Sequence, residues 1–206
     1  MARWEPDAAG RLAQAAMQLY GERGFDRTTV ADIAARAGLT ERTFFRYFAD
    51  KREVLFSGGK MLQDFVVERV ARAPAATPPL DAVAGALAET TELFEPRRDF
   101  ARQRQALIGA HPDLHERELI KLAALAAAVA EALRRRGVAA PAAGLAAEAG
   151  IAIFKSAFET WLADARKRDL AHHVRTAHAA LEAVVAGTRR QAPAAGRARR
   201  PARRPA

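Results

Sequence analysis

Two short helical segments that meet at Gly38-Leu39 constrain the fold of this chain more than any other feature. The first begins at Thr29, whose hydroxyl can accept the amide of Asp32 while the Asp32 carboxylate reaches back to Thr29. Gly38 ends that segment, and Thr40 caps a second one over Glu41–Phe48. This spacing is typical of a helix-turn-helix, whose second helix enters the major groove of DNA.

The second segment has one buried and one exposed face in this interpretation. Phe44 and Phe48 are four residues apart, so they share a helical face and are expected to pack inward. The outer surface then carries Glu41, Arg42, Thr43, Phe45, Arg46 and Tyr47.

The hydrophobic periodicity elsewhere is helical, and no alternating strand pattern occurs. A first helix is expected over Asp7–Arg23, and a long fourth helix runs from Lys51 to about Arg69, with Gly58-Gly59 inside it. The proline-rich stretch Ala73–Pro79 is a predicted linker. Further helices are predicted over 80–95, 97–110, 113–136, 141–165 and 169–186, the third of these starting at a capping box over Asp113–Glu116.

The predicted architecture is therefore all-α. A three-helix helix-turn-helix domain over residues 1–52 is joined by the long helix to a C-terminal helical ligand-binding and dimerisation domain over residues 53–186. Residues 187–206 carry seven arginines and no acidic residue, and they are expected to form a disordered basic tail. The formal net charge of +9 resides mostly in that tail, so the charge alone does not identify a DNA-binding surface.

Composition excludes several classes of protein. The absence of cysteine excludes disulfides and thiolate metal sites. No apolar run approaches the ~18 residues that span a bilayer, so we expect a cytoplasmic protein with no membrane partner.

No catalytic or metal constellation is apparent, so the chain is not expected to be an enzyme or to need a cofactor or metal. Paired carboxylates, a glycine-rich phosphate loop and a nucleophile elbow are all missing. His111 and His115 are four residues apart, but Pro112 interrupts a helix between them, and His173 and His178 are five apart and do not share a face. All five histidines are therefore predicted to be surface or capping residues: His111, His115, His172, His173 and His178.

The stretch from Leu12 to Phe56 resembles the TetR-family DNA-binding domain. The marks that carry the resemblance are Gly24-Phe25 followed by Thr28-Thr29-Val30, the turn around Gly38-Leu39-Thr40, and Tyr47-Phe48 followed by Lys51. The resemblance implies DNA-binding roles for one set of residues: Thr28, Thr29, Thr40, Arg42, Thr43, Phe45, Arg46, Tyr47 and Lys51.

Elementary chemistry gives several of these roles a physical basis. Thr29 and Thr40 stand at helix N-termini, which favour phosphate, and Lys51 can neutralise another phosphate. Arg42 can make a bidentate contact to guanine, and Phe45 can press on a thymine methyl. In the alternative interpretation the threonines only cap helices, the arginines are solvated, and Phe45 or Tyr47 is core. The family often has a small residue where Arg42 stands, which leaves the base contacts open.

The segments RTFFRYFADKREVLF and RRDFARQRQALIGAHPDLHERELIKLAALAAAVAEAL are similar to the TetR subgroup typified by the mycofactocin-system regulator. That resemblance implies an acyl-CoA-like effector in a cavity lined by Phe94, Phe100, Leu107, Leu122, Leu125, Phe154, Phe158 and Trp161. Ordinary core packing is the alternative for each of these side chains. Arg97, Arg98, Arg102 and Arg104 face either a CoA phosphate or solvent, and Ala157→Trp is expected to fill the cavity.

The resemblance also implies a homodimer built from the segments 141–165 and 169–186, where small residues allow close approach: Ala149, Ala152, Ser156, Ala157 and Thr160. The predicted function is a transcription regulator, usually a repressor, that leaves its double-stranded operator when an apolar or acyl-CoA-like molecule binds. The long fourth helix is the expected lever. The alternative function is a sequence-tolerant architectural DNA-binding protein that uses its arginine tail.

Overall fold

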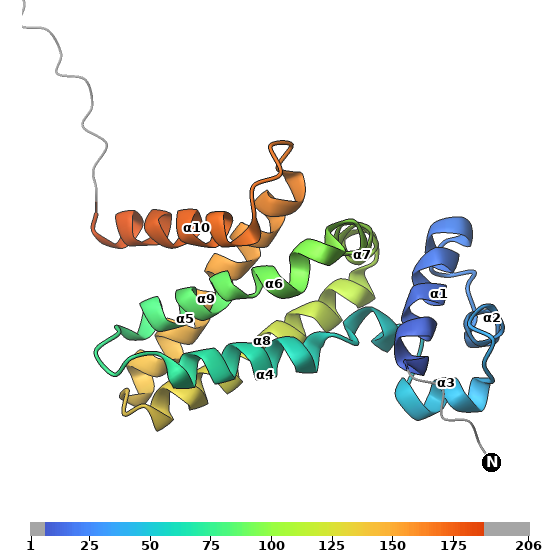
Figure 1. Cartoon of the computed structure of the whole chain (residues 1–206), viewed down its shortest axis with the longest axis horizontal. Coiled ribbons are helices and arrows are strands. Elements are labelled where there is room, and N and C mark those ends of the chain that lie inside the picture. The colour runs from blue at the N-terminus through green and yellow to red at the C-terminus, as the bar shows by residue number, and fades with distance from the viewer. Residues whose placement is uncertain (1–6, 188–206) are drawn as a thin grey trace, which may run out of the picture.

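The computed structural model describes residues 7–187, and helices form most of it (Figure 1). A small N-terminal head lies at one end of an elongated helical body (Figure 1). The elements in chain order are α1 (Ala8–Arg23), α2 (Val30–Arg36), α3 (Glu41–Tyr47), a 3₁₀ turn η1 (Glu53–Phe56), α4 (Gly59–Arg72), α5 (Pro79–Glu89), α6 (Thr91–Phe94), a 3₁₀ turn η2 (Glu95–Arg97), α7 (Arg98–Ala110), α8 (Pro112–Arg135), α9 (Ala140–Ala163) and α10 (Leu170–Val185). The predicted all-α class is confirmed.

The head is built as its sequence predicts. Thr29 and Asp32 form the capping box of α2, and Gly38, at a positive φ of 66°, makes the turn into α3. Phe44 and Phe48 are buried in a cluster with residues of α1 and α2. That cluster also takes in Val54, Leu55 and Phe56 of η1, and Ile108 and Leu114 from the start and end of the α7–α8 turn. The head is therefore packed directly onto the body.

The expectation of a continuous helix from Lys51 to Arg69 is wrong. Asp50 precedes a short 3₁₀ turn, η1, and its carboxylate accepts the amides of Arg52 and Glu53. The chain then turns at Ser57 and Gly58, and α4 begins only at Gly59. The glycine pair therefore marks the start of a helix instead of a weak point inside one, since two adjacent glycines disfavour continuation of the preceding turn.

Two other helix boundaries differ from prediction. The segment 80–95 is divided at Thr90, whose buried hydroxyl donates to the Leu87 carbonyl 2.6 Å away. The proposed capping box over Asp113–Glu116 is absent, because α8 starts earlier, at Pro112, with His111 as its N-cap residue. Proline needs no amide partner at the first helical position, so it displaced the predicted start.

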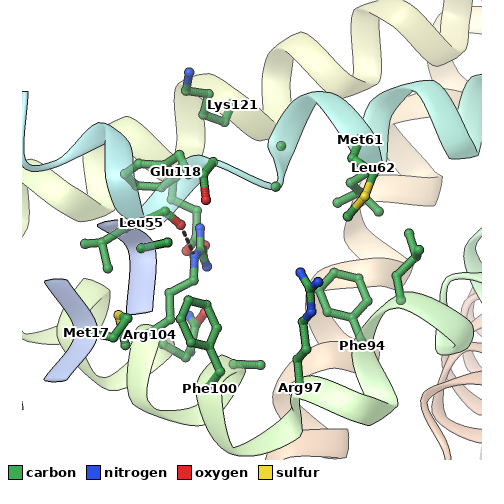
Figure 2. Close-up of a pocket in the computed structure, with 18 of the residues that line it drawn as sticks. Met17, Leu55, Met61, Leu62, Phe94, Arg97, Phe100, Arg104, Glu118 and Lys121 are labelled. Atoms are coloured by element: carbon green, nitrogen blue, oxygen red, sulfur yellow. Dashed lines mark hydrogen bonds and ion pairs between the residues drawn. The ribbon is translucent and has the colours of Figure 1, made fainter. Parts of the chain in front are cut away.

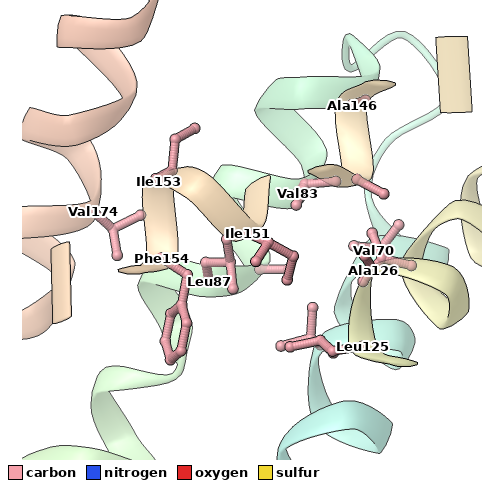
Figure 3. Packing of buried hydrophobic residues seen from close by; sticks show 14 of the residues in the cluster. Val70, Val83, Leu87, Leu125, Ala126, Ala146, Ile151, Ile153, Phe154 and Val174 are labelled. Carbon is pink, nitrogen blue, oxygen red and sulfur yellow. The ribbon is translucent and has the colours of Figure 1, made fainter. Parts of the chain in front are cut away.

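The core of the body lies where α4, α5, α8, α9 and α10 meet (Figure 3). Val83 and Leu87 of α5 face Ile151 and Phe154 of α9, and Val174 joins them from α10 (Figure 3). A Cβ atom added to Gly150 of α9 would lie 2.3 Å from Val83 Cγ1, so this glycine permits the close approach of α5 and α9.

Replacing Gly150 by alanine should therefore lower the free energy of unfolding by about 1–3 kcal/mol, because the added methyl overpacks the interface. Gly144→Ala on the same helix is the matched control, since a Cβ there meets nothing within 4 Å. That change should be neutral or stabilise the protein by up to about 1 kcal/mol. Urea unfolding measures both, and equal effects of the two substitutions would contradict the packing explanation.

No helix within residues 7–187 combines the length and the apolarity needed to cross a membrane. The arginine-rich tail predicted over residues 187–206 lies, apart from Gly187, outside the described residues.

Candidate DNA-binding face and effector cavity

A threonine caps the N-terminus of each of the two helix-turn-helix helices, α2 and α3. Thr29 Oγ1 accepts the amide of Asp32 at 3.1 Å, and Thr40 Oγ1 accepts that of Thr43 at 3.2 Å. The hydrogen bond from the Thr29 hydroxyl lowers the pKa of the Asp32 carboxyl. Both threonines remain exposed, so capping does not remove them from the surface.

The outer face of α3 carries the side chains that the sequence placed there. Phe45 is 56% exposed and Tyr47 is 40% exposed, although both are aromatic. Arg42 and Arg46 are exposed, and Thr43 is half-buried. Arg46 donates to the Tyr47 hydroxyl at 3.1 Å and lies over its ring, which holds the two side chains together. A helix that only faces solvent has no need for an exposed aromatic ring such as Phe45 beside Arg42 and Arg46, so this face suits a binding partner.

Thr28 and Lys51, which the sequence also assigned to DNA, point into the head in this structure. Thr28 is 1% exposed, and its hydroxyl donates to the Gly24 carbonyl. Lys51 Nζ donates to the carbonyls of Phe25, Asp26 and Thr28 at 2.9–3.2 Å. These bonds fix the connection between α1 and α2, so both residues position the DNA-binding face, and their phosphate contacts stay a prediction.

Tyr20 anchors this arrangement from α1. Its hydroxyl donates to the Lys51 carbonyl at 2.7 Å, so the backbone and the side chain of Lys51 are both held. Burial raises the pKa of the Tyr20 hydroxyl, with a further contribution from Asp50. The hydroxyl therefore stays protonated and keeps donating at neutral pH.

A cavity of about 1810 Å³ lies between the head and the body (Figure 2). Its walls come from α1, α3, η1, α4, α6, η2, α7, α8 and α9. One part is apolar and aromatic, with Phe94, Leu122, Leu125, Phe154 and Phe158. The part nearer the head is lined by Met17, Leu55, Phe56 and Phe100. Figure 2 shows Arg97 between Phe94 and Phe100, with its guanidinium directed into the open space.

Eight apolar residues were predicted from the sequence to line a cavity, and six of them line this one: Phe94, Phe100, Leu122, Leu125, Phe154 and Phe158. The other two are packed elsewhere. Leu107 packs against the head cluster, and Trp161 is fully buried behind the aromatic wall, where its Nε1 donates to Glu95 Oε1 at 2.7 Å. Ala157 is also fully buried in the body core, so Ala157→Trp would overpack the core instead of filling the cavity.

The four arginines of this region have separate roles that the sequence could not distinguish. Arg98 donates to the carbonyls of Trp161 and Asp164, and Arg102 donates to that of Leu162, so both cap the C-terminal end of α9. Arg104 binds the Leu55 carbonyl and Glu118. Within the described part of the chain, the exposed side chains of Arg97 and Lys155 line the cavity without a hydrogen bond or ion pair.

A charged junction between the head and α8 was missed in the sequence because its members are far apart in the chain. Glu53 of η1 accepts from Arg117 and, at 3.1 Å, from Lys121. The Arg104 guanidinium of α7 donates to the Leu55 carbonyl at 2.7 Å and to the Glu118 carboxylate at 2.9 Å. The same guanidinium lies over the Phe56 ring. The i, i+4 pair Arg117 and Lys121 on a predicted helix was the only available signal.

His173, predicted to be a surface or capping residue, is buried and closes a turn. It is 6% exposed, and its Nε2 lies 3.1 Å from Asp164 Oδ2. The Asp164 carboxylate binds Arg168 as well, and this hydrogen bond is the largest of the effects that lower its pKa. The cluster closes the turn between α9 and α10, so its role is structural.

The head and the body of this chain each match a known protein family. The family described as "Bacterial regulatory proteins, tetR family" matches residues 12–57, and "MftR C-terminal domain" matches residues 77–186, more than half of the chain. The chain belongs to the TetR family. Its members are DNA-binding transcription regulators and not enzymes, as the sequence predicted.

Curated relatives in the TetR family match over shorter segments. The HTH-type transcriptional regulator TcmR of Streptomyces glaucescens is 34% identical over 76 residues, which cover 37% of this chain and 34% of TcmR. An uncharacterised HTH-type regulator of Mycobacterium tuberculosis strain H37Rv is 39% identical over 51 residues, which cover 25% of this chain and 27% of that protein. The matches thus span about a third or less of these relatives.

Solved TetR-family structures match over nearly the whole chain. Thermus thermophilus FadR, a transcriptional repressor in complex with lauroyl-CoA, is 27% identical with a TM-score of 0.54, covering 91% of this chain and 99% of FadR. Bacillus subtilis FadR in complex with stearoyl-CoA is 18% identical with a TM-score of 0.58, covering 87% of this chain and 99% of that one, and it supports the fold alone.

Proposed function

We propose that this TetR-family regulator is a repressor that leaves its operator when a long-chain acyl-CoA binds in the cavity. The observation that carries the proposal is the cavity itself. At about 1810 Å³ it exceeds the ~300–1,000 Å³ of most ligand pockets, so it suits a molecule with a long chain and a bulky polar part. The lauroyl-CoA complex of the 27% identical FadR supports the same ligand class.

The lining of the cavity gives such a ligand an orientation. The acyl chain suits the aromatic part around Phe94, Phe154 and Phe158, because burial there removes apolar surface from water. The phosphates of CoA suit Arg97 and Lys155, whose charges are not neutralised by a described carboxylate. The head group therefore lies toward the exposed rim.

Fluorescence anisotropy of an operator–protein complex tests this function. Lauroyl-CoA and palmitoyl-CoA are expected to release the DNA, whereas lauric acid and free CoA should require at least about tenfold higher concentrations. The double change of Arg97 and Lys155 to glutamine should raise the effective acyl-CoA concentration by a similar factor. If free acids act as well as thioesters, the effector is a fatty acid and the phosphate assignment fails.

Operator recognition is proposed to depend on the exposed face of α3. Arg42→Ala should weaken binding to the preferred operator by about 1–3 kcal/mol and relax the preference at one base position per half-site, since a bidentate contact to guanine is lost. The matched control is Arg36→Ala in α2, because Arg36 is also exposed but is paired with Glu22 at 2.8 Å.

Selection of bound DNA from random sequence measures both variants. If the Arg42→Ala variant selects the same operator with unchanged affinity, Arg42 makes no base-specific contact.

We also propose that α9 and α10 form the dimer interface. Ala152, Ser156 and Thr160 of α9 are exposed small residues, and Val184 and Val185 of α10 are 76% and 79% exposed. Exposed apolar side chains on adjacent helices are costly unless another surface covers them. To enter successive major grooves of DNA, the two α3 helices of a two-fold dimer must lie about 34–36 Å apart.

A further inference from the structure

Three potential metal ligands meet between α5 and α10, in the part of the body away from the head (Figure 1). They are Asp81 in the first turn of α5, and His178 and Glu182 on α10. His178 and Glu182 are four residues apart, so the helix itself places them on one face. Packing of α5 against α10 supplies the third ligand. The helix packing therefore brings Asp81 next to two side chains that follow it by 97 residues or more in the chain.

The distances between these groups are close to those of a tetrahedral site. His178 Nε2 lies 3.3 Å from Asp81 Oδ1 and 3.9 Å from Glu182 Oε1, and the ligand atoms all lie within 4.8 Å of one another. Zinc bonds of about 2.0–2.2 Å to nitrogen and oxygen place neighbouring ligands roughly 3.3–3.6 Å apart in a tetrahedron. The His178–Asp81 pair already has that spacing, and the exposed Glu182 side chain needs only a small movement.

The environment of His178 also suits a bound cation. Its side chain is 18% exposed, and its Nε2 atom is buried without a hydrogen-bond partner among the described residues, although two carboxylates lie nearby. A buried polar atom is usually satisfied. A cation between the three side chains would bind the Nε2 lone pair and both carboxylates, leaving one position for water.

We infer that Asp81, His178 and Glu182 form a zinc site that ties α10 to α5. Imidazole together with carboxylate favours zinc over magnesium or calcium, which prefer oxygen ligands alone. The site lies in the body, separate from the effector cavity, whose walls do not include any of the three residues. Zinc would therefore stabilise the placement of α10 without competing with the effector.

The spacing of the histidines relative to one another does not reveal this site, because only one of its three ligands is a histidine. The signal that was present is His178 followed four residues later by Glu182 on a predicted helix. Asp81 could be assigned only from the structure, because nothing in the sequence places α5 against α10.

Zinc titration of the EDTA-treated, full-length protein tests the inference. We expect saturable binding of one zinc ion per chain, and replacement by cobalt(II) should give the visible bands of a low-symmetry site. His178→Gln should remove the bands and weaken zinc binding at least tenfold, since even outer-sphere losses typically cost about 10–100-fold. Asp81→Asn and Glu182→Gln should each weaken binding in the same way.

His172→Gln is the matched control, because His172 lies on the same helix and contacts Arg168 instead. This variant should bind zinc as the unaltered protein does. The thermal midpoint of the unaltered protein should rise on addition of zinc, and that of His178→Gln should not. Circular dichroism without metal checks that each variant is folded. Absence of saturable zinc binding, unchanged binding in His178→Gln, or equal loss in His172→Gln would overturn the site.

Discussion

Replacing Trp161 by alanine should lower the free energy of unfolding by about 3–5 kcal/mol, the cost typical of deleting a large buried aromatic side chain. Trp161 is fully buried, and its ring packs against Phe94 and Phe158 behind the cavity wall. The indole also donates to Glu95 Oε1, which in turn accepts the amide of Leu170 at the start of α10. The substitution therefore removes packing and one partner of a half-buried carboxylate. Since domains are typically stable by only about 5–15 kcal/mol, this loss is a large fraction of the total.

Trp161→Phe separates packing from hydrogen bonding. It keeps most ring contacts but leaves Glu95 without the indole N–H, so a smaller loss of about 1–3 kcal/mol is expected. Phe100→Ala is the comparison for the cavity, because Phe100 is exposed at 36% and lines the open space (Figure 2). It should weaken acyl-CoA binding with little change in stability. Urea unfolding and ligand titration measure the two properties. Trp161 would be a ligand contact after all if Trp161→Phe weakened ligand binding while leaving stability unchanged.

The contrast between Trp161 and Phe100 shows how far sequence could predict the cavity. Helical periodicity identifies which residues face inward, but a wall of a cavity and the core behind it have the same composition. Phe94, Phe154 and Phe158 are therefore indistinguishable from Trp161 until the helices are assembled. In the head, by contrast, local signals suffice: Thr29, Gly38 and Thr40 act within one turn of their own helices, and the predicted faces of α3 are confirmed.

Errors in the helix boundaries have similarly local physical causes. The Asp50 carboxylate accepts the amides of Arg52 and Glu53, but the segment that follows is a 3₁₀ turn and not the start of a long α-helix. Val54, Leu55 and Phe56 pack into the head, and this packing favours the 3₁₀ turn over a continuous α-helix. A segment this short has no hydrophobic periodicity from which the packing could be predicted. The consequence is functional, since the expected lever does not extend from the head without interruption.

Arg104→Met should uncouple the effector from the operator, because Arg104 joins the cavity to the segment that replaces the expected lever. Arg104 lines the cavity on α7 and donates to the Leu55 carbonyl of η1 at 2.7 Å. Its other contact, Glu118 of α8, lies 2.9 Å away, and the two side chains are only 20% and 16% exposed. We therefore expect a ligand that moves α7 or α8 to act on the head through η1, which comes before α4 in the chain. Methionine keeps the packing of the long side chain but removes both contacts.

We expect the unaltered protein to bind its operator about 5–150-fold more weakly when acyl-CoA is bound, the usual range of allosteric coupling. In Arg104→Met this factor should fall to a few-fold, while acyl-CoA still binds the DNA-free protein. Glu118→Gln should have the same effect, since it weakens the same contact. Arg134→Met is the matched control on α8, because Arg134 pairs only with Glu131 at the surface.

Coupling is reciprocal, so operator DNA must weaken acyl-CoA binding by the same factor that acyl-CoA weakens operator binding. Anisotropy with labelled operator and calorimetry with acyl-CoA therefore give two independent values for each protein. If both remain at the unaltered level in Arg104→Met, the signal does not pass through the contact with η1. Two other connections to the head would then be tested next: the packing of Ile108 and Leu114 into the head cluster, and the ion pairs of Glu53 with Arg117 and Lys121.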